Sequence, residues 1–262
     1  MKSSSAIGII LLALANQIPS SLAQMATEVI PGDSILVPGY IAEAIASSNR
    51  PIADKLRDTG RRPAEIMSFF DVRPGDMVAE LITGGGYYAS ILSGIVGDSG
   101  KVYGHANDWF MGRQKAGSPL LKRIASGHYS NVEEVVFELE DIALPVGGMD
   151  AIFVFLIYHD AVGAFQTDRV RMNKGIYAAL KPGGIYGVID HHSSPGLGIS
   201  DTTKNHRIER HVVVEEIIAA GFDFDEETDL LENLNDPLDV SVFNPSVRGN
   251  THRMVLKFRK PQ

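Results

Sequence analysis

The sequence contains no cysteine and only one tryptophan among its 262 residues. Without cysteine there are no disulfides, no cysteine nucleophiles and no thiolate-bound zinc or iron–sulfur clusters. Basic residues are outnumbered, since 24 Lys and Arg stand against 32 Asp and Glu, a net charge of −8. Nucleic acids and anionic membrane surfaces bind net basic faces, so neither is an expected partner. Any chemistry must therefore come from histidines, carboxylates, hydroxyls or a bound cofactor.

The apolar run nearest the N-terminus, residues 6–15, is only ten residues long. Crossing a bilayer takes about 20 apolar residues. Lys2 precedes the run, and Ser21-Leu22-Ala23 follows with the small-x-small pattern of a signal-peptidase site. The pattern predicts a signal peptide over residues 1–23 and an exported protein, periplasmic or secreted, with no stable membrane anchor after cleavage. The alternative is a short buried N-terminal helix.

Residues 24–70 differ from the rest of the chain. An extended stretch with two prolines comes first, and residues 41–70 then show apolar positions at helical spacing, interrupted by Pro51 and Pro63. This segment also carries a charged cluster, for which a solvated helical face is the favoured interpretation and an anion or carboxylate clamp the alternative. The cluster consists of Asp54, Lys55, Arg57, Asp58, Arg61 and Arg62.

From residue 72 onward, short apolar strands alternate with helices. This pattern predicts an α/β fold, Rossmann-like and doubly wound, with a mostly parallel seven-stranded sheet. Strands are expected at 76–81, 101–104, 132–138, 151–156, 185–189, 239–243 and 254–258, and helices at 87–96, before 124, and at 173–180 and 212–220. The last two strands, with Arg248-Gly249-Asn250 as their turn, are expected to form an antiparallel C-terminal hairpin.

Chemistry-bearing residues follow several of these strands. In an open α/β sheet, ligands bind beyond the carboxyl ends of the strands. Glu80 and the turn 83–86 follow the first strand, and Glu140 and Asp141 the third. Tyr158-His159-Asp160 and Asp190-His191-His192 follow the fourth and fifth, which we expect to be neighbours. Three of the eight histidines therefore gather at one place.

The glycine turn reads Glu80-Leu-Ile-Thr-Gly84-Gly85-Gly86-Tyr-Tyr. It has neither the G-x-G-x-x-G spacing of a nicotinamide site nor the Gly-Lys-Ser/Thr of a P-loop. Glycines permit a close approach of a ligand to a helix N-terminus. An acid four residues before them suits a ligand that carries an ammonium group and a nucleoside.

At this point the chain resembles class I S-adenosylmethionine-dependent methyltransferases, and more narrowly a bacterial group of exported "predicted methyltransferases". The resemblance spans residues 50–260. It is carried by Arg73–Glu80, Gly84–Tyr88, Gly100–Gly104, Tyr158-His159-Asp160, Lys181-Pro182-Gly183-Gly184, Asp190-His191 and His206-Arg207. It implies an N-terminal extended segment and helical lid over 24–70 and a methyltransferase-like α/β domain over 71–262.

The resemblance also implies the site. S-adenosylmethionine is the expected cofactor, and the residues expected to bind it are Glu80, Gly84, Gly85, Gly86, Tyr87, Asn107 and Asp141, with Glu140 as the rival of Asp141. His159 is the expected general base, since its pKa lies near working pH. Asp160 or Asp190 would orient that imidazole, while His191 and His206 line the substrate side. Two positions depart from the family, because Ile82 replaces the first glycine and Ala106 the ribose-binding acid.

Three functions remain open at this stage. The first is methyl transfer to a small molecule. The second is a non-catalytic ligand-binding protein, favoured by Ile82 and Ala106 and by the cytoplasmic origin of S-adenosylmethionine. The third is a metal-assisted hydrolase or lyase, because His159, Asp190, His191 and His206 offer ligands for zinc, iron or manganese. No compact H-E-x-x-H spacing supports a metal, so none is predicted.

Overall fold

The computed structural model describes residues 28–29, 35–113 and 118–262. The signal peptide expected over residues 1–23 lies outside this part of the chain. Among the residues described, no helix is both long and apolar enough to cross a membrane.

Seven strands form the main sheet in the order β5-β4-β3-β6-β7-β9-β8. They are β3 (Met77–Leu81), β4 (Lys101–Ala106), β5 (Val132–Val136), β6 (Met149–Phe155), β7 (Leu180–His191), β8 (Asp223–Thr228) and β9 (Arg253–Arg259). Neighbouring strands from β5 to β7 are parallel, whereas β9 runs antiparallel to both β7 and β8. The predicted fold is therefore confirmed, including the pairing of the fourth and fifth strands.

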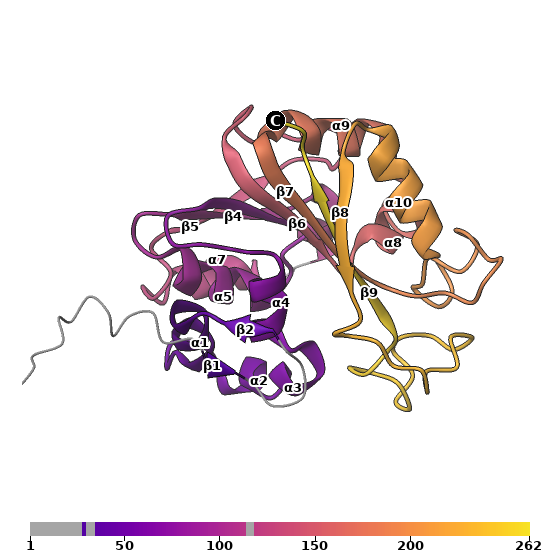
Figure 1. Cartoon of the computed structure of the whole chain (residues 1–262), viewed down its shortest axis with the longest axis horizontal. Coiled ribbons are helices and arrows are strands. Elements are labelled where there is room, and N and C mark those ends of the chain that lie inside the picture. Colours follow the sequence, from indigo (N-terminus) through magenta and orange to yellow (C-terminus); the bar gives the residue numbers. More distant parts are fainter. Residues whose placement is uncertain (1–27, 30–34, 114–117) are drawn as a thin grey trace, which may run out of the picture.

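Helices cover both faces of this sheet (Figure 1). One face carries α1 (Gly39–Ala46), α4 (Pro63–Phe69), α5 (Tyr87–Val96) and α7 (Pro119–Ile124), and the other carries α8 (Tyr158–Gly163), α9 (Arg169–Ala179) and α10 (Arg210–Ala219). Val78 and Ala79 are neighbours in β3 but belong to different apolar clusters. This alternation divides the core into two layers, one on each side of the sheet.

The N-terminal segment contains short helices, and also a two-stranded sheet that the sequence did not predict. The strands are β1 (Glu28–Val29) and β2 (Leu36–Val37), and the short helices that follow α1 are α2 (Ile52–Lys55) and α3 (Asp58–Arg61). The solvated face expected for the charged cluster is wrong in part. Asp54 is buried and pairs with Arg123 of α7, with 2.6 Å between Nη1 and Oδ2. Its burial follows from the packing of α2 against the body of the fold.

Asp58 is the second correction to the solvated face. Its carboxylate accepts hydrogen bonds from the guanidinium group of Arg50, at 2.6 and 2.8 Å, and from the hydroxyl of Tyr87, at 2.6 Å. Arg50 itself is buried. The cluster therefore joins the N-terminal helices to α5.

The C-terminal hairpin exists, but its first strand was misplaced. Residues 239–243 form no strand, and the edge strand is β8, whose sequence is DFDEET. Five of its six side chains are exposed, so β8 lacks the apolar alternation on which a strand prediction depends. Arg248-Gly249-Asn250 lies within the long connection between β8 and β9, and forms no tight hairpin turn.

Candidate functional site

A cavity of about 700 Å³ lies at the carboxyl end of the parallel strands. It lies between α2–α3 and the connection from β8 to β9, which are both below the sheet in Figure 1. Its walls are Leu56, Arg57, Gly60, Arg61, Leu156, His159, Asp160, His191, Val242, Phe243, Arg248, Gly249, Asn250, Thr251 and Arg253. Three of the five residues expected to be catalytic line this cavity.

Two close contacts join α3 to the C-terminal part of the chain beside the cavity. The guanidinium group of Arg253 donates a hydrogen bond to the carbonyl oxygen of Gly60 at 2.5 Å. A Cβ atom at Gly60 would lie 2.5 Å from the carbonyl oxygen of Gly249. Only glycine allows this approach of α3 to the C-terminal connection.

His159 is held from behind by Asp190. The Nδ1 atom of His159 lies 2.7 Å from Oδ1 of Asp190, and its backbone amide donates to Oδ2 at 2.8 Å. Asp190 is fully buried, and it also accepts from the amide of His191 at 2.7 Å. The sequence left two orienting acids open, and Asp190 is the one bonded to Nδ1. This bond leaves Nε2 of His159 as the ring nitrogen available to other groups.

His206 and Asp160 face that free nitrogen. The Nε2 atom of His159 lies 3.3 Å from Nδ1 of His206 and 3.4 Å from Oδ1 of Asp160. The same Oδ1 lies 3.1 Å from Nδ1 of His206. His206 has a φ of 56°, and Leu156 on the cavity wall has a φ of 62°. Such left-handed backbone is costly for residues other than glycine and tends to occur at functional sites.

The environments of His159 and His191 move their pKa values in opposite directions. Burial lowers the pKa of His159, but the charges of Asp190 and Asp160 outweigh burial and raise it above its ordinary value. Burial, followed by the positive charge of His159 and nearby arginines, holds the pKa of His191 well below its ordinary value. The Nδ1 atom of His191 lies 2.7 Å from the hydroxyl of Thr251. Nearby carboxylates therefore dominate the pKa of His159, whereas burial dominates that of its neighbour His191.

Positive charge dominates the rest of the cavity. Four arginines line it, against the single carboxylate of Asp160. They are Arg57, Arg61, Arg248 and Arg253. Guanidinium groups bind carboxylates and phosphates through paired hydrogen bonds, so the cavity is suited to an anion.

Glu80 lies at the end of β3 beside the glycine turn. It is buried, and its Oε2 atom has no hydrogen-bond partner among the residues described. Burial raises the pKa of Glu80 to about 8, although Arg61 and Arg123 oppose this shift. Burial of this carboxyl group therefore outweighs the two nearby arginines.

The glycine turn holds the conformation that a close backbone approach requires. Gly84 and Gly86 have φ values of 59° and 76°, and Gly86 precedes the first residue of α5. Ile82, the departure from the family, still has a φ of 52°. Its amide donates to Nδ1 of the buried His105 at 3.1 Å. The backbone therefore keeps the geometry for which glycine is the usual residue.

Side chains of α7 lie over this turn. A Cβ atom at Gly86 would lie 3.0 Å from Cδ of Arg123 and 3.1 Å from Cδ1 of Leu120. A Cβ atom at Gly85 would have no described atom within 4 Å. The surface of the turn is thus covered on one side and open on the other.

The structure treats the remaining expected cofactor residues differently. Asn107 is buried, its Oδ1 atom accepts from the amide of Phe110 at 3.0 Å, and its Nδ2 atom has no partner among the described residues. Asp141 is exposed and ion-paired with Arg171. Tyr87 packs against three guanidinium groups at 4.5 to 5.5 Å and donates to Asp58. Glu80 and Asn107 thus keep unpaired polar atoms, whereas Asp141 and Tyr87 are bonded to other groups.

Sequence reasoning missed the contribution of the β8–β9 connection. Phe243 packs edge-on against His206 at 4.9 Å, and Thr251 and Arg253 complete the wall. The basic pair of Arg248 and Arg253 within six residues was an available signal. The sequence pattern places Arg248 in a turn and gives Arg253 no role.

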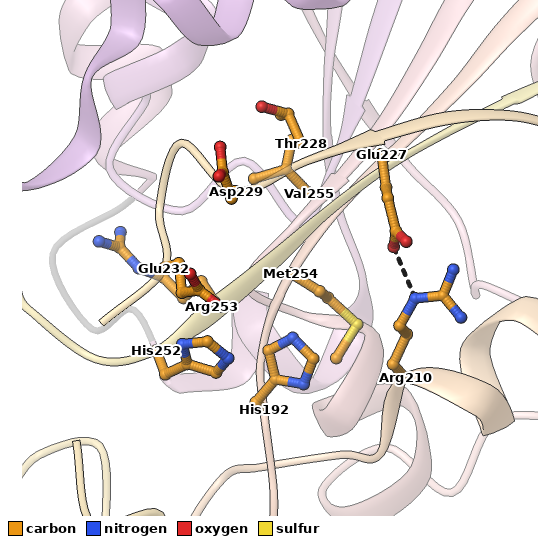
Figure 2. Close-up of a pocket in the computed structure, with 10 residues that line it drawn as sticks. All are labelled: His192, Arg210, Glu227, Thr228, Asp229, Glu232, His252, Arg253, Met254 and Val255. Carbon is orange, nitrogen blue, oxygen red and sulfur yellow. Dashed lines mark hydrogen bonds and ion pairs between the residues drawn. The ribbon is translucent and has the colours of Figure 1, made fainter. Parts of the chain in front are cut away.

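A second cavity, of about 510 Å³, lies beside β8 and β9 (Figure 2). His192 and His252 face each other there with ring centroids 4.4 Å apart, and Arg210 pairs with Glu227 at 2.6 Å. Burial and the neighbouring His252 lower the pKa of His192 to about 4. None of the residues expected to be catalytic or to bind the cofactor lines this cavity. His192, the third of the histidines expected to gather at the strand ends, lies here and not in the first cavity.

Neither a family model nor a curated protein sequence matches this chain. Solved structures with the same fold include a SAM-dependent methyltransferase from Aquifex aeolicus, at 17% identity, with a TM-score of 0.57 and coverage of 82% of this chain and 96% of that one. A geranyl diphosphate methyltransferase in complex with SAM matches at 13% identity, with a TM-score of 0.54 and coverage of 91% and 94%. The [4+2]-cyclase SpnF matches at 16% identity, with a TM-score of 0.55 and coverage of 84% and 92%. These likenesses establish a methyltransferase fold, and the cyclase illustrates that the fold alone does not fix the reaction.

Proposed function

We propose that this protein is an S-adenosylmethionine-dependent methyltransferase that acts on a small anionic molecule. The proposal depends on one observation, which is that the histidine cavity and Glu80 lie close together at the carboxyl edge of the sheet. Arg61 lines the histidine cavity and also lies near enough to Glu80 to oppose the rise of its pKa. A cofactor on the glycine turn and an acceptor in the cavity would therefore be neighbours.

The donor set around the glycine turn fits the cofactor. The carboxylate of Glu80 suits an ammonium group, the backbone amides at the start of α5 suit a carboxylate, and the free Nδ2 of Asn107 suits a ribose hydroxyl. Gly84, Gly85 and Gly86 allow the close approach. S-adenosylmethionine, when bound, supplies an electrophilic methyl group on a sulfonium centre. Asp141 is already paired with Arg171 and Tyr87 with Asp58, so we assign neither residue a contact with the cofactor.

The cavity would hold the acceptor. Its arginines supply the charge that binds an anion, and its volume of about 700 Å³ is in the range of small-molecule sites. His159, oriented by Asp190, presents Nε2 for the proton that the acceptor loses, while Asp160, His191 and His206 position the acceptor. The proposal therefore assigns the binding of the anion to the arginines and proton transfer to His159.

Cofactor binding can be tested by calorimetric titration of the purified chain with S-adenosylmethionine and S-adenosylhomocysteine. We expect micromolar dissociation constants that weaken at least tenfold in Glu80→Gln. The exposed Glu133→Gln is the matched control and should bind as the wild type does. An absence of binding would overturn the proposal.

Turnover separates an enzyme from a binding protein on the same fold. Candidate carboxylates and phosphates are incubated with the cofactor, and S-adenosylhomocysteine is measured. Product that depends on His159 supports methyl transfer. Tight cofactor binding without product for any anionic acceptor would favour the ligand-binding alternative.

We also propose that the protein is exported. The apolar run of residues 6–15 and the Ser21-Leu22-Ala23 pattern support this proposal. Expression of the full chain in a bacterium, followed by fractionation and N-terminal sequencing, should give a periplasmic product that starts at Gln24. A cytoplasmic product that retains Lys2 would contradict it.

A further inference from the structure

We propose that His159, Asp160 and His206 form a binding site for one divalent transition-metal ion. The ligand atoms are Nε2 of His159, Oδ1 of Asp160 and Nδ1 of His206, and they all lie within 4.8 Å of one another. The inference goes beyond methyl transfer and does not depend on it, because metal binding can be read without a cofactor or a turnover.

The separations between these atoms are those of ligands around one ion. They are 3.3 Å between the two nitrogens, 3.4 Å from Oδ1 to Nε2 and 3.1 Å from Oδ1 to Nδ1. Zinc binds histidine nitrogen and carboxylate oxygen at about 2.0 to 2.2 Å, so tetrahedral ligands lie about 3.3 to 3.5 Å apart. An octahedral arrangement brings neighbouring ligands to about 3 Å. The separations of 3.3 and 3.4 Å match the tetrahedral arrangement, and the separation of 3.1 Å lies between the two arrangements.

Hydrogen bonding alone does not satisfy the three atoms. The Nδ1 atom of His159 is bonded to Asp190, so the neutral ring presents a lone pair at Nε2. If Nδ1 of His206 carries a proton and donates it to the carboxylate of Asp160, the lone pair on Nε2 of His159 has no hydrogen-bond donor among these groups. A cation placed between the three atoms satisfies them all.

Asp190 supplies the support that metal-binding histidines commonly have. Such a histidine donates its other ring nitrogen to a carboxylate, which fixes the ring and raises its basicity. Asp190 is fully buried, and two backbone amides, those of His159 and His191, also donate to it. The imidazole of His159 is therefore oriented toward its two neighbours before any ion binds.

The ligand set indicates the class of ion. Two imidazoles and one carboxylate are ligands of intermediate softness, which suit Zn²⁺, Fe²⁺ or Mn²⁺ better than Ca²⁺ or Mg²⁺. Three protein ligands leave further coordination positions, and His159 and Asp160 both line the cavity. An acceptor oxygen held by the arginines could occupy one of them.

A bound ion would change the part that His159 plays in methyl transfer. Its Nε2 lone pair would be used in coordination, so it would no longer accept a proton. An acceptor hydroxyl bound to the ion would instead release its proton to solvent water, since coordination makes a bound hydroxyl more acidic. If the protein binds no metal, the cofactor proposal is unaffected. If it binds no cofactor, the metal proposal is unaffected.

The test uses the purified full chain, stripped with a chelator and dialysed against Zn²⁺ or Co²⁺. We expect one equivalent of Zn²⁺ at micromolar free ion, and an absorption spectrum of bound Co²⁺ that reports nitrogen and oxygen ligands. Asp160→Asn removes the charge and keeps the shape, and His206→Phe keeps the ring that packs on Phe243. Both should weaken binding at least 100-fold, and Asp190→Asn by about 10- to 100-fold.

His192→Phe is the matched control, because this histidine lies in the second cavity (Figure 2). It should bind one equivalent as the wild type does. Circular dichroism establishes that each variant is folded, and His206→Phe decides the question if Asp160→Asn does not fold. The proposal is overturned if the wild type retains no Zn²⁺ or Co²⁺, if the folded ligand variants bind as tightly as it does, or if His192→Phe loses as much.

Discussion

The glycine-turn side and the histidine side of this site lie at the same edge of one sheet, yet their polar groups are arranged in opposite ways. At the glycine turn, Glu80 and Asn107 are buried, and each has one polar atom without a hydrogen-bond partner among the residues described. On the histidine side, Asp190 is buried but accepts three hydrogen bonds. One side is assembled in the free protein, and the other lacks partners that a ligand would bring.

This difference has an energetic meaning. A buried group with its bonds satisfied contributes to folding, whereas a buried unpaired carboxyl costs free energy. Proteins accept such costs where a ligand repays them. The comparison predicts that substitutions on the two sides change stability in opposite directions.

The largest effect is expected at Asp190. Asp190→Ala leaves Nδ1 of His159 and the amides of His159 and His191 without their buried acceptor. We expect the free energy of unfolding to fall by about 3–5 kcal/mol, the range for breaking a buried pair. Urea denaturation measures it. Asp225→Ala, which removes an exposed ion pair with Arg259, is the control and should cost less than about 1 kcal/mol. An equal loss of unfolding free energy in the two variants would show that Asp190 contributes no more than an exposed ion pair.

Glu80 should behave in the opposite sense and depend on pH. Its pKa is about 8 in the folded chain and 4.5 ordinarily, so the folded state binds more protons between these values. Stability therefore falls as pH rises from about 4.5 to 8 and changes no further above that. Glu80→Gln removes this loss and should be more stable than the wild type by about 2–4 kcal/mol at pH 8, with little difference at pH 4.

The groups that face Glu80 are Arg61 from α3, Arg123 from α7 and Tyr88 from α5. The free energy of unfolding is measured for the wild type and for Glu80→Gln from pH 4 to 8.5. The difference between the two pH dependences reports the contribution of Glu80. The exposed Glu133→Gln should show the wild-type slope. A wild-type slope in Glu80→Gln as well would mean that the buried carboxyl is ionised throughout.

The smallest effect is expected where the N-terminal helices meet the glycine-turn side. Tyr87→Phe removes the hydrogen bond to Asp58, and Arg50 still neutralises that carboxylate. We expect a loss of about 1 kcal/mol. A double-mutant cycle with Asp58→Ala isolates the coupling. A coupling energy near zero would show that the N-terminal helices and α5 are held together by their apolar contacts alone.

The sequence was a good guide to β3 and α5 and a poor one to the C-terminal edge. Val78 and Ala79 are both apolar because β3 is buried on both faces, and α5 begins and ends at the residues expected. The edge strand β8 carries exposed acidic side chains and pairs with β9 alone among the described strands. Its strand conformation depends on hydrogen bonds to β9, and these are invisible in local composition.

The residues of the candidate site also divide into those that strand order places and those that it does not. His159 and Asp160 follow β6, and Asp190 and His191 end β7, so the parallel pairing of these strands places them together as expected. His206 joins them from a loop 47 residues after His159, and Arg253 from an antiparallel strand. No spacing rule relates such positions: only the resemblance pointed to His206, and nothing in the sequence pointed to Arg253.

By itself, the sequence determined the alternation of strands and helices, and therefore which residues would lie at the carboxyl edge of the sheet. Periodicity and turn residues are local properties, and they suffice for this. Only the tertiary structure decided that Asp54 and Asp58 are paired with arginines instead of solvated, that Asp141 bonds to Arg171, and that Asp160 faces two imidazoles. Each of these outcomes depends on a partner distant in sequence, and charge partners are chosen by packing.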